Sequence, residues 1–184
     1  MAYEPEHTVP LHLAGRDIYP NGIEMPLEIE RKYLLRNDGW RSLGEGKRYR
    51  QGYLSTEPGR IVRVRVAAGR GFITVKGLTV NVTRPEYEYP IPVEDANEML
   101  DTLCLKPIIE KIRYTIEHDG LLWEVDEFEG ENAGLVIAEV ELARADQPIL
   151  LPDWIGEEVT DDPRYYNASL IANPFTTWGN NPSD

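Results

Sequence analysis

Residues 27–35 read LEIERKYLL, with apolar and charged side chains in alternation. Successive side chains of a β-strand point to opposite faces, so residues two apart share a face. Glu28, Glu30 and Lys32 would therefore lie on one face, and Leu27 and Ile29 on the other. The stretch predicts a strand that is charged on one side and apolar on the other.

Seven further runs of similar alternation follow, separated by Gly, Pro and Asn residues that favour turns. The connections at residues 68–71 and 118–120 are short enough for hairpins, which indicates antiparallel pairing. Helical spacing or a helix-start signal predicts helices at residues 93–103 and 162–172. The predicted strands after the first are 47–55, 61–67, 71–76, 84–90, 108–118, 121–128 and 135–142.

These elements predict one domain of the α+β class, predominantly antiparallel β, at residues 26–174. Residues 1–25 carry no clean periodicity and are expected to form a flexible leader. Residues 175–184 are expected to form a mobile tail.

The composition excludes several classes of protein. With 32 acids against 19 bases, the chain of 184 residues has a net charge of −13 and lacks the basic footprint of a nonspecific nucleic-acid binder. No apolar stretch is long enough to span a membrane. The single cysteine, Cys104, excludes an internal disulfide and favours a reducing compartment, so we expect a cytoplasmic protein.

Charges at every second position recur from strand to strand, with mixed signs. A solvent-facing sheet with cross-strand ion pairs would account for any one of these strands. If the sheet curls closed over its charged face, however, the interior is costly to fold unless a ligand completes the pairing, and such a cost indicates function. The set comprises Glu28, Glu30, Lys32, Arg63, Arg65, Lys76, Arg84, Glu86, Glu88, Lys111, Arg113, Glu124, Asp126, Glu139 and Glu141.

The two kinds of charge suit different partners. Carboxylates two residues apart, as in Glu28/Glu30 and Glu139/Glu141, offer oxygen ligands for a hard cation such as Mg²⁺ or Mn²⁺. Arginines and lysines in series match a row of phosphate groups. A metal together with a basic clamp is the recurring apparatus of phosphoryl transfer, so the pattern indicates a metal-dependent enzyme that acts on a triphosphate.

The chain resembles the CYTH superfamily, also called triphosphate tunnel metalloenzymes, over about residues 27–172. The family signature Glu-x-Glu-x-Lys is matched by residues 28–32. The later motifs follow in the family's order: Arg63-Val64-Arg65, Lys76, Lys111-Ile112-Arg113, Glu124-Val125-Asp126 and Glu139-Val140-Glu141. The resemblance implies an antiparallel, eight-stranded closed tunnel with flanking helices.

The resemblance also implies roles for individual residues. The run Arg50-Gln51-Gly52-Tyr53-Leu54 is similar to the second strand of small bacterial members, in which the tyrosine and the signature lysine activate water. Lys32 and Tyr53 would then be catalytic, although Tyr53 also fits a packed strand aromatic. The implied metal ligands are Glu28, Glu30, Asp126, Glu139 and Glu141, for Mg²⁺ or Mn²⁺. The implied phosphate contacts are Arg63, Arg65, Lys76, Arg84, Lys111 and Arg113.

The first functional hypothesis is hydrolysis of inorganic tripolyphosphate, because small members with a Gln-Gly-Tyr-Leu strand resemble the inorganic tripolyphosphatases. A class IV-type adenylate cyclase, a thiamine triphosphatase and a non-catalytic module that binds polyphosphate or nucleotides remain alternatives. The expected partner is a small-molecule triphosphate, without nucleic acid or membrane, in a monomer or homodimer.

Overall fold

The computed structural model of the chain describes residues 16–18, 24–26, 29–78, 86–144 and 146–180. Two of the implied site residues, Glu28 and Arg84, lie outside these ranges. The same holds for residues 27–28 of the first predicted strand, residues 84–85 of the fifth, residues 181–184 of the expected tail and most of the expected leader. In the described part of that leader, β1 (Arg16–Ile18) and β2 (Glu24–Pro26) form an antiparallel pair.

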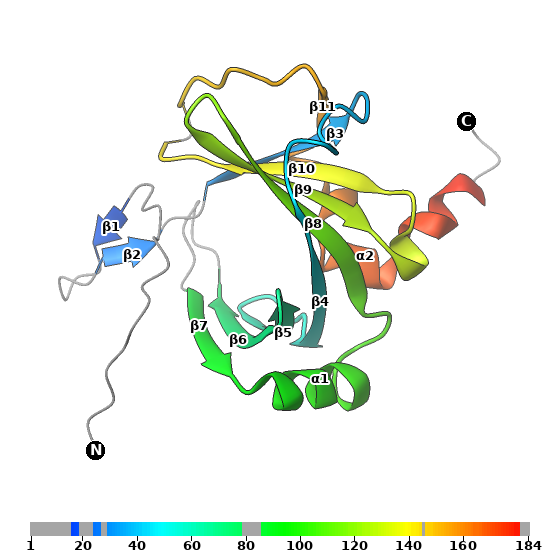
Figure 1. Ribbon diagram of the computed structural model, residues 1–184. Coiled ribbons are helices and arrows are strands. Elements are labelled where there is room, and N and C mark those ends of the chain that lie inside the picture. Colours follow the sequence, from blue (N-terminus) through cyan, green and yellow to red (C-terminus); the bar gives the residue numbers. More distant parts are fainter. Residues whose placement is uncertain (1–15, 19–23, 27–28, 79–85, 145, 181–184) are drawn as a thin grey trace.

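Most of the described chain forms one antiparallel sheet, in the strand order β11-β3-β10-β9-β8-β4-β5-β6-β7 (Figure 1). The described residues supply nine strands to it. The predicted antiparallel, strand-dominated fold is therefore confirmed. The strands are β3 (Glu30–Leu35), β4 (Gly46–Ser55), β5 (Arg60–Ala67), β6 (Arg70–Gly77), β7 (Glu86–Ile91), β8 (Ile109–His118), β9 (Leu121–Phe128), β10 (Val136–Glu141) and β11 (Ile155–Glu158).

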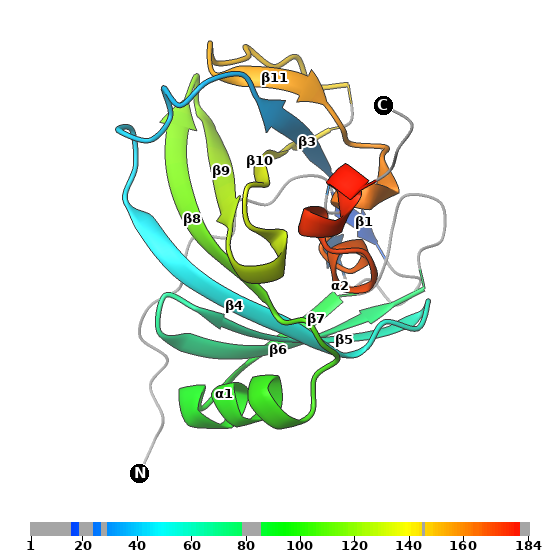
Figure 2. The same ribbon diagram turned by 90° about the vertical axis from the view of Figure 1, so that its right-hand side faces the viewer.

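The sheet curves strongly around one of its faces. Figure 2 shows β4 and β8 leading from the half that contains β9, β10 and β3 to the half that contains β5, β6 and β7. Among the described residues no ladder joins the edge strands β7 and β11, so the tunnel is not closed by hydrogen bonds there. We call the inward-curving side the concave face.

The convex face is apolar and covered. Helix α1 (Val93–Thr102), predicted from its helical spacing, packs Ala96 and Leu100 against Val64 of β5. Around the other half of the sheet, Trp40, Trp123 and Trp154 belong to a second buried cluster. Burial of these large side chains supplies the main hydrophobic stabilisation on this side.

One end of the concave face is also apolar. Tyr53, Ile109, Phe128 and Ile137 pack there with Leu170 of α2 (Ser169–Ala172), which lies inside the curve of the sheet (Figure 2). We call this group the apolar plug. Because strand residues two apart share a face, the plug is continuous with charged positions farther along the same strands.

The C-terminal segment differs from the prediction of one helix at 162–172. A 3-10 helix, η2 (Pro163–Tyr165), is separated from α2 because Tyr166 is extended and its hydroxyl donates to the Thr160 carbonyl at 3.2 Å. Residue 175, where the mobile tail was expected to begin, instead starts a 3-10 helix, η3 (Phe175–Asn180). The Phe175 N–H donates to Asn132 Oδ1 at 2.8 Å, which ties this segment to the domain.

No helix in the described ranges has the length and apolar character needed to cross a membrane.

Candidate active site

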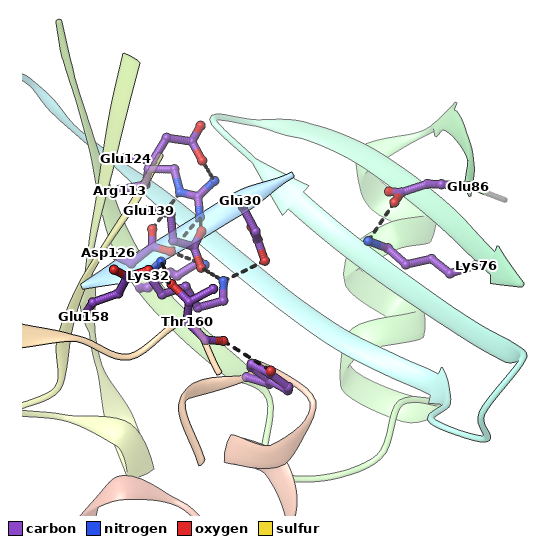
Figure 3. Close-up of polar contacts among 12 residues, drawn as sticks. Glu30, Lys32, Lys76, Glu86, Arg113, Glu124, Asp126, Glu139, Glu158 and Thr160 are labelled. Carbon is purple, nitrogen blue, oxygen red and sulfur yellow. Dashed lines mark hydrogen bonds and ion pairs between the residues drawn. The ribbon is translucent and has the colours of Figure 1, made fainter. Parts of the chain in front are cut away.

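Seven charged residues on β3, β8, β9 and β10 gather on the concave face, and Figure 3 labels all of them except Lys111. The ladders place Glu139 opposite both Lys32 and Glu124, and Asp126 opposite Arg113. Directly opposed side chains on one face are close neighbours, which is why these residues meet. We call Glu30, Lys32, Lys111, Arg113, Glu124, Asp126 and Glu139 the inner charge cluster.

Contacts within the inner charge cluster form one connected network. Lys32 Nζ lies 2.8 Å from Glu30 Oε1 and 2.5 Å from Glu139 Oε1. The Arg113 guanidinium donates to Asp126 Oδ1 and Oδ2, both at 2.6 Å, and to Glu139 Oε2 at 3.0 Å. Arg113 therefore brings two carboxylates from different strands within reach of a single nitrogen, Nη2.

The network is shielded from water. Only 1% of Lys111 and 1% of Asp126 is exposed, and their ion pair measures 2.5 Å. Removing both charges from water carries a penalty that their attraction offsets only when the remaining hydrogen bonds are also made. Buried charges of this kind occur at several positions on one face, and such clusters are typical of functional sites.

Burial and neighbouring charges shift the pKa values in opposite directions. Burial alone would raise the pKa of Glu139, but Lys32 and Arg113 hold it well below its usual range. Burial alone would lower the pKa of Lys32, yet Glu139 and Glu30 raise it. By contrast, burial and then Arg113 lower the pKa of Lys111 despite its contact with Asp126. The neighbouring acids therefore compensate the positive charge of Lys111 only in part. A bound anion would stabilise that charge.

A second charged group lies on β5, β6 and β7. Lys76 Nζ is 2.8 Å from Glu86 Oε2, and Arg65 Nη2 donates to Glu88 Oε2 at 3.0 Å. Figure 3 shows Lys76 and Glu86 across from Glu30 and Lys32. Burial and then Arg63 lower the pKa of Arg65, so this group also holds an incompletely compensated cation. We call Arg63, Arg65, Thr74, Lys76, Glu86 and Glu88 the outer-strand cluster.

The Tyr49 ring on β4 joins the two clusters. The guanidinium carbon of Arg113 lies 5.3 Å from its centroid, and that of Arg65 lies 6.0 Å away. Two cations on the same ring require that β8, β4 and β5 present these side chains on one face. The basic residues of both clusters therefore face a common region.

A family model matches most of the chain. Residues 26–170 match the model described as CYTH domain. The chain belongs to the CYTH domain family.

Two relatives are similar to this chain over most of its length. The chain is 52% identical over 151 residues to an inorganic triphosphatase of Acetivibrio thermocellus, covering 82% of this chain and 97% of that protein. It is 38% identical over 151 residues to an inorganic triphosphatase of Nitrosomonas europaea, covering 78% and 95%. A crystal structure of an inorganic triphosphatase has a TM-score of 0.60 at 37% identity, covering 78% of this chain and 93% of that one.

The CYTH motifs of this chain are distributed over three places. Glu30, Lys32, Lys111, Arg113, Asp126 and Glu139 meet in the inner charge cluster, and Arg63, Arg65 and Lys76 lie in the outer-strand cluster. Glu141, which is exposed, stands opposite Glu30 on the ladder between β10 and β3. Tyr53 is 6% exposed and lies in the apolar plug, opposite Arg63 on β5.

The four acids of the inner charge cluster each contact a base, and in the described ranges no group of three or more Asp, Glu, His or Cys residues is placed to hold a metal ion. The donor set nevertheless suits a hard divalent cation, because carboxylate oxygens are its preferred ligands. Glu30 and Glu141 are like charges at directly opposed positions, which repel each other. Carboxylates of two neighbouring strands thus face the same side, as a shared divalent cation would require.

Sequence reasoning missed three residues that the structure places beside this site. Tyr49 joins the clusters, Gln51 is only 2% exposed on the same strand, and Thr160 accepts a hydrogen bond from the Lys32 N–H at 3.0 Å. Tyr53 was selected by the family resemblance, and period-two alternation along the same predicted strand assigns Tyr49 and Gln51 to its face, so that signal was available. Nothing local to Thr160 indicates its contact with a residue 128 positions away.

Proposed function

We propose that this CYTH domain hydrolyses inorganic tripolyphosphate to pyrophosphate and phosphate with the help of Mg²⁺ or Mn²⁺. The observation that carries the proposal is the convergence of bases from separate strands on one face, with the lysines buried and the arginines partly buried. They are Lys32, Arg63, Arg65, Lys76, Lys111 and Arg113. A linear triphosphate has the several closely spaced anionic groups that such a set can hold.

The bases bind the substrate by exchanging acidic partners for phosphate oxygens. Arg113 and Arg65 present planar guanidinium groups that can each contact two oxygens, and Lys111 acts as a point charge. The lowered pKa values of Lys111 and Arg65 indicate that the protein stabilises their positive charges only in part. A bound phosphate would supply the missing negative charge. Preorganised cations in a water-poor site stabilise the charge that develops during phosphoryl transfer.

The acids of the same face would hold the metal ion. Glu30 and Glu141 oppose each other directly, Glu139 lies two residues before Glu141 on β10, and Asp126 lies on the neighbouring strand β9. Glu28, the first acid of the signature, completes the proposed set. The bound metal would neutralise phosphate charge, which is the chemistry that these carboxylates cannot supply.

Lys32 and Tyr53 are proposed to orient the attacking water. Water attacks a terminal phosphorus, the bond to the bridging oxygen breaks, and pyrophosphate leaves with the electron pair. The proton lost by the water passes to the departing oxygen or to solvent. The Lys32 ammonium is held by two carboxylates, so its position is well defined. Tyr53 lies where the apolar plug meets the charged face, which limits competing water there.

A substrate and product screen tests the proposal. Purified protein is supplied with tripolyphosphate, ATP or thiamine triphosphate, each with Mg²⁺, Mn²⁺ or a chelator, while phosphate, pyrophosphate and cyclic AMP are measured. We expect tripolyphosphate to give equal amounts of phosphate and pyrophosphate, and the chelator to stop the reaction. Cyclic AMP as the main product from ATP would favour a cyclase instead. Tight binding by calorimetry without any product would favour a binding module.

A further inference from the structure

Three buried N–H donors on β4 and β5 have no hydrogen-bond partner among the described residues. They are Gln51 Nε2, Arg63 Nε and Arg65 Nε. Buried polar atoms without a partner are rare in folded proteins, and each one needs a physical explanation. Here all three atoms are donors, so one kind of partner, an acceptor, would satisfy them together.

The ladder between β4 and β5 brings these donors together. Gln51 stands directly opposite Arg65, and Arg63 stands opposite Tyr53, two positions along the same strand. Side chains two apart share a face, and Tyr49, two residues before Gln51, stacks with Arg65 and Arg113 on the concave face. Gln51 therefore belongs to the same face as both charge clusters.

Nearby acids do not satisfy the three donors. Glu88 accepts hydrogen bonds from Arg65 Nη2 and from the Thr74 hydroxyl, which leaves the Nε atoms of both arginines without an acceptor. The Gln51 amide is 2% exposed, so bulk water does not replace a partner. An anion at this place would supply acceptor oxygens to all three groups.

We propose that Gln51 is a substrate-binding residue whose amide N–H donates to a non-bridging phosphate oxygen of a linear polyphosphate. This inference rests on the proposed function and adds a neutral residue to its basic clamp. Gln51 adjoins the apolar plug through Tyr53 and Ile109, while Arg65 and Arg63 of the facing strand β5 keep its surroundings basic.

A structural role for the amide predicts a different outcome. If Gln51 served only the fold, Gln51→Met would leave substrate affinity unchanged. If it binds phosphate, Gln51→Met should raise KM for tripolyphosphate about tenfold, with a smaller change in kcat, since one hydrogen bond to a charged group is lost. The melting temperature of the free protein should stay equal or rise, because an unsatisfied donor is removed. Gln51→Glu should raise KM further, because it places a negative charge beside the phosphate.

The experiment compares wild type, Gln51→Met, Gln51→Glu and the control Gln147→Met. Gln147 lies outside both clusters, where its Oε1 accepts from the Ala143 N–H at 2.9 Å. KM and kcat for tripolyphosphate are measured with metal, and calorimetry measures its Kd with chelator. Gln147→Met should match the wild type in both measurements.

The possible failures can be told apart. A wild type that hydrolyses tripolyphosphate, with KM unchanged in Gln51→Met, overturns this inference and leaves the proposed function standing. A lowered melting temperature with unchanged KM would show that the amide is structural. A wild type without any hydrolysis overturns the proposed function, and equal Kd values for wild type and Gln51→Met then overturn this inference as well.

Discussion

Lys32 and Glu139 stand directly opposite each other on β3 and β10, with Lys32 Nζ 2.5 Å from Glu139 Oε1. A phosphate that binds Lys32 must compete with this carboxylate. Glu139 also accepts from Arg113, so it holds two bases of the proposed clamp in place. The pair thus links the stability of the fold to the binding of substrate.

Glu139→Gln should destabilise the protein by about 3 kcal/mol, because two buried cations lose a counter-charge. Urea unfolding with a shared m-value measures the change. Tripolyphosphate should restore part of the loss, since its oxygens replace the missing carboxylate. The matched control is Glu127→Gln, which removes a more exposed acid paired with Arg41 at 2.8 Å and should cost about 1 kcal/mol or less. Equal losses for the two variants would contradict the account.

The contribution of Glu139 to the free energy of unfolding should decrease as the pH falls. Its folded pKa is held below the ordinary value of 4.5, so its stabilisation is fully present above that value. As the pH falls below 4.5 toward the folded pKa, the wild type loses this stabilisation and Glu139→Gln does not. The difference in unfolding free energy between them should therefore narrow in acid. A difference that stays constant from pH 6 down to about pH 3 would rule out this linkage.

Arg63→Ala should chiefly raise KM for tripolyphosphate, by roughly tenfold or more, because a charge-assisted contact to phosphate is lost. Arg60→Ala is the control on the same strand. Its side chain is 73% exposed and pairs with Glu57, so its KM should stay within about twofold of wild type. Steady-state kinetics at saturating metal measures both KM values. Similar KM values for the two variants would show that Arg63 does not bind phosphate.

Tyr53→Phe should chiefly lower kcat, by roughly 100-fold, if the hydroxyl orients the attacking water. Loss of one hydroxyl preserves the ring and its packing in the apolar plug. Tyr33→Phe serves as the comparison, because the Tyr33 hydroxyl is buried in the convex core without a partner among the described residues. Equal kcat values for Tyr53→Phe and Tyr33→Phe would show that the Tyr53 hydroxyl has no catalytic role and that the side chain serves only packing.

The periodicity of the strands was enough to predict which charged residues share a face. Period-two alternation assigns Lys32 and Glu139 to the charged side whatever their partners are. It does not determine that they pair, because they are 107 positions apart and their register depends on the turns and curvature of the chain between them. Pairing and burial emerge only from the assembled sheet.

Strand β11 and Thr160 show where sequence reasoning fails. The residues Ile155-Gly156-Glu157-Glu158 lack apolar–charged alternation, so no strand was predicted there. The strand forms because β3 offers a free edge: Val159 N–H donates to the Lys32 carbonyl at 2.8 Å, and the Lys32 N–H donates to Thr160 Oγ1. The orphaned Gln51 donor likewise depends on neighbours that only the fold brings together.

The central claim is that chemistry takes place on the concave face, and two adjacent residues of β3 test it most directly. Lys32 points into the inner charge cluster, whereas Arg31 pairs with Glu158, its Nε 2.7 Å from Glu158 Oε1. The measurement is kcat/KM for tripolyphosphate in Lys32→Ala and Arg31→Ala. The account predicts a loss of roughly 100-fold or more for Lys32→Ala and only a few-fold for Arg31→Ala. Equal losses, or a larger loss for Arg31→Ala, would contradict it.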